Sequence, residues 1–567
     1  MKHIKYIIGA VLVALVMNSC VGDLNVTPID PNANTADKVL VDKAAYENFL
    51  AGVYLCFATS GYYGANGSPS ISGLDGGASQ YLRGLYNLNE LTTDESVCGW
   101  NDQTIKDLHW MCWTTADTFI YAFYSRIFIV VSMANEFIYE ATREGALEFD
   151  GKQQLIDEAR VLRAIAYYHA IDNFGNVPFN DKFDGSVPQQ IKRADLYEWL
   201  EKELIDLKDN STLPERSATA YGHVNKSVAK FLLAKLYLNA EVYTGTKAYD
   251  KCAAVLKDLM DDGYSLHTSS AGKYNAYQEL FLADNNRCTD EIILAIEQDG
   301  INTTSYGATN YLIFASTGGI MDPDEMGISS GWGGLRTTPQ FVDKFDTKDA
   351  RYLFYDTERS TAQVEAMPEK PEDAPAKYDS KTIEKLKKDG EYDEECEKLI
   401  KAKEAAHDNI QQKDIEDIGN FIYGYGFMKY RNRTSDGGYG KELGFVDTDF
   451  PLMRYADVLL MAAECEARGA AVDGYKGFNA VRQRAGLAAI STPTLQQILD
   501  ERGRELYQEC WRRSDLIRFG KFTSADYLWQ WKGNVKEGKA VDSYRALFPI
   551  PDSDRLANSN LVQNPGY

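Results

Sequence analysis

The sequence predicts a mainly α-helical protein built from paired helices. Apolar residues recur every three or four positions in several long segments, as they do from Leu155 to Ala170, and this period places them on one face of a helix. Two regions form helix–turn–helix units of about 34 residues, which is the length of a tetratricopeptide repeat. Between the helical segments lie long stretches rich in Gly, Tyr and Trp, where little regular structure is expected.

The N-terminus has the form of a bacterial lipoprotein signal. Two lysines precede an apolar run from Ile7 to Met17, which is too short to span a bilayer but has the length of a signal-peptide core. The run ends in Asn18-Ser19-Cys20, which resembles a lipobox, whereas an ordinary secretory signal ends in a small-x-small site. We therefore predict that Cys20 is lipidated; an ordinary signal with a chance cysteine is the alternative.

This signal sets the predicted domain organisation. Residues 1–19 are removed, residues 20–37 form the lipid anchor and an extended tether rich in Pro, Asn and Asp, and residues 38–567 form a single domain. The lipid on Cys20 is then the chain's attachment to the membrane.

Composition limits the partners that the chain can have. The 83 acidic residues outnumber the 60 basic ones, and the net charge is −23. Nucleic acid binds to basic protein surfaces, so we expect no nucleic-acid partner for this acidic chain. The eight cysteines other than Cys20 lack zinc-type spacing. Buried free thiols are the simplest interpretation, although an exported protein can also pair some of them.

Five helices are predicted before residue 241. Each is an apolar pattern of helical period, and they cover Val39–Phe57, Phe119–Thr142, Leu155–Asn173, Asp195–Leu207 and Val228–Ala240. The third helix ends before Gly175 and Pro178, because Gly supplies a C-terminal turn and Pro blocks continuation.

Four further helices follow. Tyr249–Met260 comes after the turn Thr244-Gly245-Thr246 and closes a hairpin with the helix before it. Tyr455–Ala462 and Tyr475–Arg484, separated by a glycine-containing break, form a second hairpin. The last helix runs from Pro493 to Gly520, since Pro suits the first turn after the capping candidate Thr492. Its charged residues have the spacing of ion pairs within one helix: Glu501, Arg502, Glu505, Glu509, Arg512, Arg513, Asp515 and Arg518.

Three long segments interrupt the helical pattern. Residues 58–115 and 300–350 are rich in Gly and aromatic residues, and loops of this length in a compact protein are usually functional. Residues 365–417 are rich in Glu and Lys, which predicts a solvated helical insertion; its role is not evident from the sequence.

Motifs for catalysis and metal binding are weak. Gly327-Ile328-Ser329-Ser330-Gly331 matches the nucleophile-elbow pattern, but the required strand before it and helix after it are not expected. A glycosidase needs two carboxylates that face each other across a cleft. With so many acidic residues such a pair can always be found, so the sequence neither supports nor excludes a glycosidase. Asp322, Asp324 and Glu325 could hold a structural calcium ion through oxygen ligands, with a solvated acidic loop as the alternative. We expect no other cofactor.

The two aromatic loop regions carry the candidate ligand-binding residues. A sugar presents a C–H face that lies on an aromatic ring and hydroxyl groups that need planar donors and acceptors. Aromatic, amide and guanidinium side chains gather in both regions, and they are Tyr81, Arg83, Trp100 and Asn101 in the first and Tyr306, Asn310, Tyr311 and Trp332 in the second. For any single residue, the alternative is that its side chain packs a loop against the helical part of the protein and contacts no ligand.

Several motifs in fixed order resemble those of a known family. They are Leu155–Ala164 with Tyr167-Tyr168 and Phe174–Pro178, then Met453–Met461, Glu501–Arg518, Leu547–Pro551 and Asn560–Tyr567. Behind a lipobox, this set is similar to the SusD/RagB family of Bacteroidetes outer-membrane lipoproteins. The charged segment 365–417 is the main departure.

The resemblance implies a SusD-like fold with four tetratricopeptide-like helix pairs in a right-handed superhelix and loop-rich additions that carry the ligand site. It implies no enzymatic activity and a place on the cell outer membrane, facing the exterior. It implies a SusC-like TonB-dependent barrel as partner and a glycan as the captured nutrient. Arg83, Trp100 and Asn101 lie where starch-binding members hold sugar, and Trp332 lies in a second contributing region. Some members carry peptides, so a peptide-binding subunit is the first alternative and a lipoprotein glycosidase a more distant one.

Overall fold

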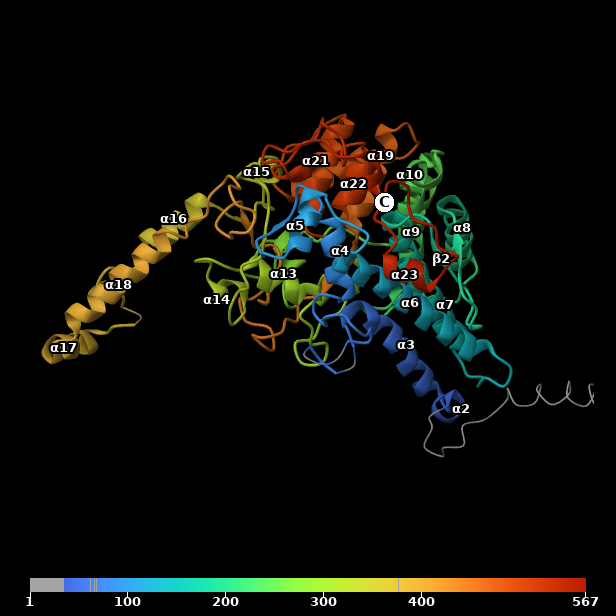
Figure 1. Ribbon diagram of the computed structural model, residues 1–567, viewed down its shortest axis with the longest axis horizontal. Coiled ribbons are helices and arrows are strands. Elements are labelled where there is room, and N and C mark those ends of the chain that lie inside the picture. Colours follow the sequence, from blue (N-terminus) through green and yellow to red (C-terminus); the bar gives the residue numbers. More distant parts are fainter. Residues whose placement is uncertain (1–34, 62, 66, 68, 376) are drawn as a thin grey trace, which may run out of the picture.

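The computed structural model describes residues 35–61, 63–65, 67, 69–375 and 377–567. The predicted signal peptide, Cys20 and residues 20–34 of the predicted tether lie outside the described residues. The described part is mainly helical, as predicted, with short strands between the helices (Figure 1).

Eight helices form a continuous stack in chain order. They are α3 (Lys43–Ala58), α6 (Thr118–Thr142), α7 (Lys152–Asn173), α8 (Arg193–Asp209), α9 (Lys226–Leu238), α11 (Tyr249–Met260), α19 (Tyr455–Ala467) and α20 (Gly474–Arg484). Each contacts the next one along this series. The stack therefore consists of the consecutive pairs α3/α6, α7/α8, α9/α11 and α19/α20, which matches the number of pairs predicted.

Two glycines allow the helices of the last pair, α19 and α20, to pack closely. A Cβ atom on Gly474 would lie 2.3 Å from the carbonyl carbon of Ala462, and one on Gly477 would lie 2.8 Å from a methyl carbon of Leu459. Both contacts are too short for any side chain, so the two glycines are what allow α20 to approach α19.

The shorter elements surround this stack. The remaining α-helices in the described residues are α2 (Ala36–Val39), α4 (Tyr81–Asn89), α5 (Gln103–Trp110), α10 (Ala240–Thr244), α12 (Ala276–Glu279), α13 (Ala308–Ser316), α14 (Pro323–Met326), α15 (Pro339–Val342), α16 (Thr357–Glu365), α17 (Ser380–Asp389), α18 (Tyr392–His407), α21 (Leu495–Leu506), α22 (Arg512–Arg518) and α23 (Asp552–Ala557). Four antiparallel strand pairs are formed by β1 (Val97–Cys98) with β5 (Leu335–Arg336), β2 (Val177–Phe179) with β3 (Gln189–Ile191), β4 (Ile292–Ile296) with β8 (Phe450–Arg454), and β6 (Phe354–Tyr355) with β7 (Gly426–Phe427).

Three sequence-based expectations about secondary structure are wrong. The first loop region contains α4 and α5, and the second contains α13, α14, β5 and α15. Every residue of α4 is buried, its polar residues included, so these do not mark a solvent-facing side. The predicted last helix is two helices, α21 and α22, because Gln508 and Cys510 between them have positive φ. The cap of α21 is Thr494, which forms a capping box with Gln497.

Helix α6 is the most apolar of the long helices. By length and composition it could cross a membrane, yet more than half of its most apolar window is buried inside the protein, where it packs against α3, α4 and α7. It is therefore a core helix of the stack. The eight described cysteines are free thiols, and five of them are buried, in agreement with the simplest interpretation of the sequence.

Residues of the charged segment 365–417 contribute to α16, α17 and α18, which project from the body as an arm (Figure 1). Helix α17 has no buried residue, and surface ion pairs such as Lys401–Glu397 run along α18. The small cluster of Val364, Ala406 and Ile410 packs at the base of the arm.

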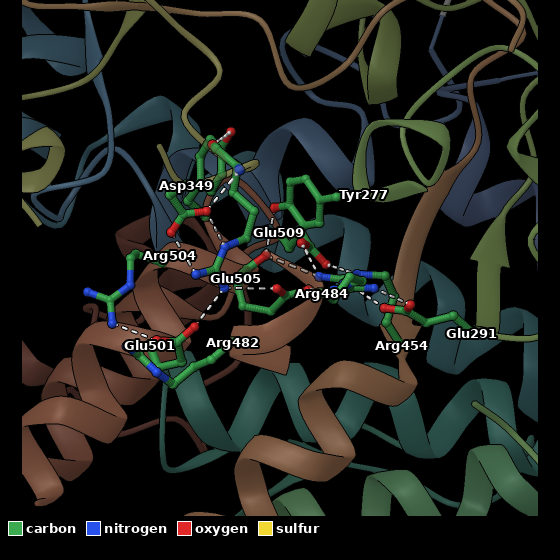
Figure 2. A network of polar contacts seen from close by, with 12 residues as sticks. Tyr277, Glu291, Asp349, Arg454, Arg482, Arg484, Glu501, Arg504, Glu505 and Glu509 are labelled. Carbon is green, nitrogen blue, oxygen red and sulfur yellow. Dashed lines mark hydrogen bonds and ion pairs between the residues drawn. The ribbon is translucent and has the colours of Figure 1, made fainter. Parts of the chain in front are cut away.

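The charged residues near the C-terminus form a buried network between elements (Figure 2). Arg454, at the end of β8, pairs with Glu291, Glu505 and Glu509. Its nitrogen atoms lie 3.0 Å from an oxygen of Glu505 and 2.7 Å from one of Glu509, and all four side chains are buried.

The prediction of ion pairs within one helix is therefore largely wrong. Glu501–Arg504 and Asp515–Arg518 are intrahelical, but most partners come from other elements, as in Arg512–Asp94 and Arg518–Glu464. The physical reason is burial: α21 and α22 are enclosed, so their charges must find partners on the segments packed against them. Burial alone would raise the pKa of Glu505, but three arginines around it lower that pKa to about 2.

We expect Arg454→Met to destabilise the protein by about 3–5 kcal/mol, because it removes a positive charge that three buried carboxylates share and leaves them only partly compensated. The measurement is the urea midpoint of unfolding, followed by circular dichroism. Lys401→Met is the matched control, since it removes an exposed ion pair, and its midpoint should equal that of the unmodified chain. Equal midpoints for Arg454→Met and the control would contradict a stabilising network.

Candidate functional site

The pairing of β1 with β5 brings the two aromatic loop regions together. Val97 is opposite Arg336 and Cys98 is opposite Leu335. The ladder extends past the strands, because the N–H of Gly99 donates to the carbonyl of Gly334 at 2.8 Å. Residues more than 200 positions apart in the chain thus meet at the end of this strand pair.

Four side chains at this junction reach the surface, and we call them the aromatic site: Trp100, Asn101, Tyr306 and Trp332. Asn101 is exposed and the three rings are partly exposed. The rings of Tyr306 and Trp332 lie 6.0 Å apart between centroids, and the indole N–H of Trp100 donates to the carbonyl of Trp332 at 3.2 Å. The Oδ1 atom of Asn101 accepts from Lys106 at 2.5 Å, which leaves its NH₂ group free of a described partner.

Helix α13 holds Trp332 through both its backbone and its ring. Its backbone N–H donates to the carbonyl of Phe314 in α13 at 2.7 Å, and its ring packs on that of Phe314 at 5.0 Å. Gly334 follows and lies under the ring of Trp100, where a Cβ atom would approach a ring carbon to 2.8 Å. The backbone of this segment therefore fixes both indoles.

Beneath the surface rings, Arg83 lies between two aromatic side chains. Its guanidinium carbon is 4.4 Å from the ring centroid of Tyr311 and 5.4 Å from that of Trp100. Arg83 is 9% exposed, so the contact is largely desolvated, which strengthens a cation–π interaction. Burial raises the pKa of Tyr311 well above its ordinary value, and its hydroxyl group donates to Asn87.

Three of the eight residues predicted to contact a ligand are too buried to do so. Tyr81 and Tyr311 are 0% exposed and Asn310 is 2% exposed. Tyr81 is a core residue whose hydroxyl group lies 2.7 Å from Nδ1 of His169. As direct ligand contacts these three predictions are contradicted by burial; Tyr311 instead supports Trp100 and Arg83 from below.

The sequence analysis missed residues 418–445, which border the site with two aromatic side chains. Phe445 packs on Tyr306 at 5.6 Å between centroids, and the partly exposed Phe421 lies against the backbone of Gly318 and Gly333. Arg336 holds the start of these residues by donating to the carbonyl of Ile418 at 2.7 Å. The run of aromatic and glycine residues after position 420 was the available signal.

The predicted calcium ligands have separate partners. Asp322 caps α14 through the N–H of Asp324, Asp324 accepts from Tyr439, and Glu325 pairs with Arg359 at 2.6 Å. Within the described residues, no group of three or more His, Cys, Asp or Glu side chains is placed to hold a metal ion. The calcium site stays a prediction to which this geometry gives no support.

The segment that matches the nucleophile-elbow pattern lies between a helix and a strand. Residues 327–331 follow α14 and precede β5, whereas the motif requires a strand first and a helix second. Ser329 therefore lacks the structural context of a catalytic serine.

Comparison with known proteins assigns the family. The chain is 33% identical to the starch-binding protein SusD of Bacteroides thetaiotaomicron over 576 aligned positions, which cover 100% of this chain and 99% of that protein. The SusD family model matches residues 290–567, and a model described as starch-binding associating with outer membrane matches residues 78–238. The chain belongs to the SusD family, and the resemblance seen in the sequence is confirmed.

Solved structures show the same fold. Surface glycan-binding protein A from Bacteroides thetaiotaomicron, in complex with laminarihexaose, aligns over 92% of this chain and 99% of its own, with a TM-score of 0.65 and 18% identity. A SusD-like protein from Bacteroides fragilis aligns over 96% and 100%, with a TM-score of 0.65 and 16% identity. The SusD-like fold class predicted from the sequence is thereby confirmed.

We expect Gly334→Ala to cost about 1–3 kcal/mol, the usual penalty for an added methyl group in a packed region, because the Cβ atom would displace the ring of Trp100. Urea unfolding measures the change. Gly444→Ala is the control, since a Cβ atom there meets open space. The account of the site fails if both variants unfold at the same urea concentration.

Proposed function

We propose that this protein captures a glycan at the aromatic site and passes it to a SusC-like TonB-dependent transporter of the outer membrane. In this proposal the chain is anchored through lipid on Cys20 and faces the cell exterior. It binds its cargo and cleaves no bond.

The observation that carries the proposal is the β1–β5 register. It brings two partly exposed indoles, Trp100 and Trp332, next to the exposed amide of Asn101. Ring faces suit the C–H face of a sugar, and an amide donates to and accepts from its hydroxyl groups. Arg83 is too buried to be a main contact, and its guanidinium group instead holds the ring of Trp100.

The family supports the same proposal. The full-length relative is named a starch-binding protein, a protein of the same fold was solved with laminarihexaose, and the model matching residues 78–238 is described as associating with the outer membrane. An open site of a few rings gives modest affinity. Closure against a barrel would bury more of the ligand and add binding free energy beyond the cost of ordering it.

We expect Trp100→Ala and Trp332→Ala each to weaken glycan binding at least tenfold, because truncating a central contact residue costs about 2 kcal/mol or more. Isothermal calorimetry with maltohexaose and laminarihexaose measures the affinity. Trp199→Ala is the control: it removes another partly buried tryptophan, on α8, that packs on Tyr167 at 5.3 Å and should leave affinity unchanged.

The same experiment distinguishes the other functions that the sequence allowed. Capped peptides are titrated beside the glycans, and each reaction is analysed for products by chromatography. Saturable glycan binding without products supports the proposal. Binding of peptides alone would indicate a peptide importer, and released sugars would indicate a glycosidase. Unchanged glycan affinity in both tryptophan variants would remove the site assignment.

A further inference from the structure

A cavity of about 480 Å³ lies beside α6, and it shares no lining residue with the aromatic site. Its walls come from α6, from residues 178–188, which include the loop between β2 and β3, and from residues 554–561, which include most of α23. Helices α6 and α23 are far apart in the chain but lie next to each other in the fold (Figure 1). The volume is in the range of small-molecule sites.

Both ends of the loop over this cavity are fixed by hydrogen bonds. At the first end, the backbone N–H of Asn180 donates to the hydroxyl group of Tyr167 at 2.9 Å, and the carbonyl of Asn180 accepts from the side-chain amide of Asn135 at 2.7 Å. At the other end, the carbonyl of Pro188 accepts from the side-chain amide of Asn558 at 2.9 Å. The loop is thus held to the helices on one side and to the C-terminal segment on the other, so the cavity is part of the fold.

One polar group in the cavity wall is buried without a partner. Tyr124 of α6 lines the cavity and is 1% exposed, and its hydroxyl group has no hydrogen-bond partner among the described residues. Its ring is held by Phe128 at 4.7 Å and edge-on by Phe174 at 5.1 Å. An unpaired hydroxyl in the interior costs free energy. A ligand in the cavity would supply the missing partner.

An acceptor faces the same cavity from the C-terminal segment. Asp554 of α23 lines it, and its Oδ2 atom accepts from the hydroxyl group of Ser553 at 3.1 Å. Burial raises the pKa of Asp554, and burial together with the charge of Asp554 raises the pKa of Tyr124. The carboxylate is thus close to the hydroxyl group of Tyr124, yet no hydrogen bond joins them. A ligand hydroxyl group fits this arrangement, because it can accept from Tyr124 and donate to Asp554.

Apolar surface surrounds these two polar groups. The ring of Phe128 is partly exposed and lines the cavity. On the loop, Phe183 is 44% exposed and Val187 is 62% exposed, and both also line it. Exposed large apolar side chains gathered at one place mark a binding surface, and aromatic rings suit the C–H face of a sugar.

We propose that this cavity is a second carbohydrate site that holds one sugar unit, with Tyr124 as donor and Asp554 as acceptor to its hydroxyl groups and with the rings of Phe128 and Phe183 against its C–H face. The inference rests on the proposed function only for the class of ligand. Its residues are separate from the aromatic site, so either site can fail in an experiment while the other remains.

Saturation-transfer NMR on the full chain in detergent tests the proposal. The background is the double variant Trp100→Ala/Trp332→Ala, in which the aromatic site is disabled. The probes are the methyl glycosides of glucose, galactose, mannose and N-acetylglucosamine, and tetrahydropyran is the control ring without hydroxyl groups. We expect at least one glycoside to bind saturably and tetrahydropyran to show no saturable binding, because the cavity selects for hydroxyl groups.

Substitutions in this background assign the binding to the cavity. We expect Tyr124→Phe to weaken glycoside binding about three- to tenfold, the effect of losing one hydrogen bond. Its urea midpoint should not fall, since the hydroxyl group has no partner in the free protein. Tyr139→Phe is the matched control, because it removes the hydroxyl group of an exposed tyrosine on the same helix outside the cavity, and it should leave affinity unchanged.

A blocking variant gives a second test. Ser132 is exposed on α6 and lines the cavity, so Ser132→Trp should abolish glycoside binding by filling the space. The proposal is overturned if no glycoside binds in the double tryptophan background, if tetrahydropyran binds as well as the glycosides, or if Tyr124→Phe and Ser132→Trp, shown folded by circular dichroism, retain full affinity. Loss of all sugar binding in that background would remove this cavity as a site and leave the aromatic site standing.

Discussion

The constraint on which this fold depends is that a buried charge must have a partner. Arg454, Glu505 and Glu509 are fully enclosed, yet together with Glu291 and Arg484 they join β4, β8, α20 and α21 in one network (Figure 2). Such a network contributes little net stability compared with an apolar core, but removing one member is costly because the others stay buried. The network therefore fixes how the last helix pair meets the rest of the stack.

A second constraint is the backbone pairing of β1 with β5, which positions the aromatic site. β1 and β5 have two residues each, and a pair so short is not stable alone. It persists because Arg336 donates to the carbonyl of Ile418 and because α4 packs against α13 below it. The site is thus held by the same rigid body as the stack, which suits a binding surface that must present its rings in a fixed arrangement.

Local patterns explain how much of this could be predicted. The helices α6, α7, α8, α9 and α11 could be predicted because their apolar period is local, and Gly175 and Pro178 mark the end of α7 in the sequence. Helix α4 was hidden because it is buried on all sides. The partners of Arg454 and Arg512 were hidden because sequence spacing shows only neighbours within a helix. Two of the motifs that carry the family resemblance, Met453–Met461 and Glu501–Arg518, supply members of this network.

Prediction of the site was limited in a similar way, because the type of a residue indicates its chemistry but not whether its side chain is exposed. Trp100, Asn101, Tyr306 and Trp332 reach the surface, while Tyr81, Asn310 and Tyr311, chosen on the same grounds, are buried. The cavity beside α6 escaped prediction because its walls come from α6, residues 178–188 and residues 554–561, which meet only in the folded chain.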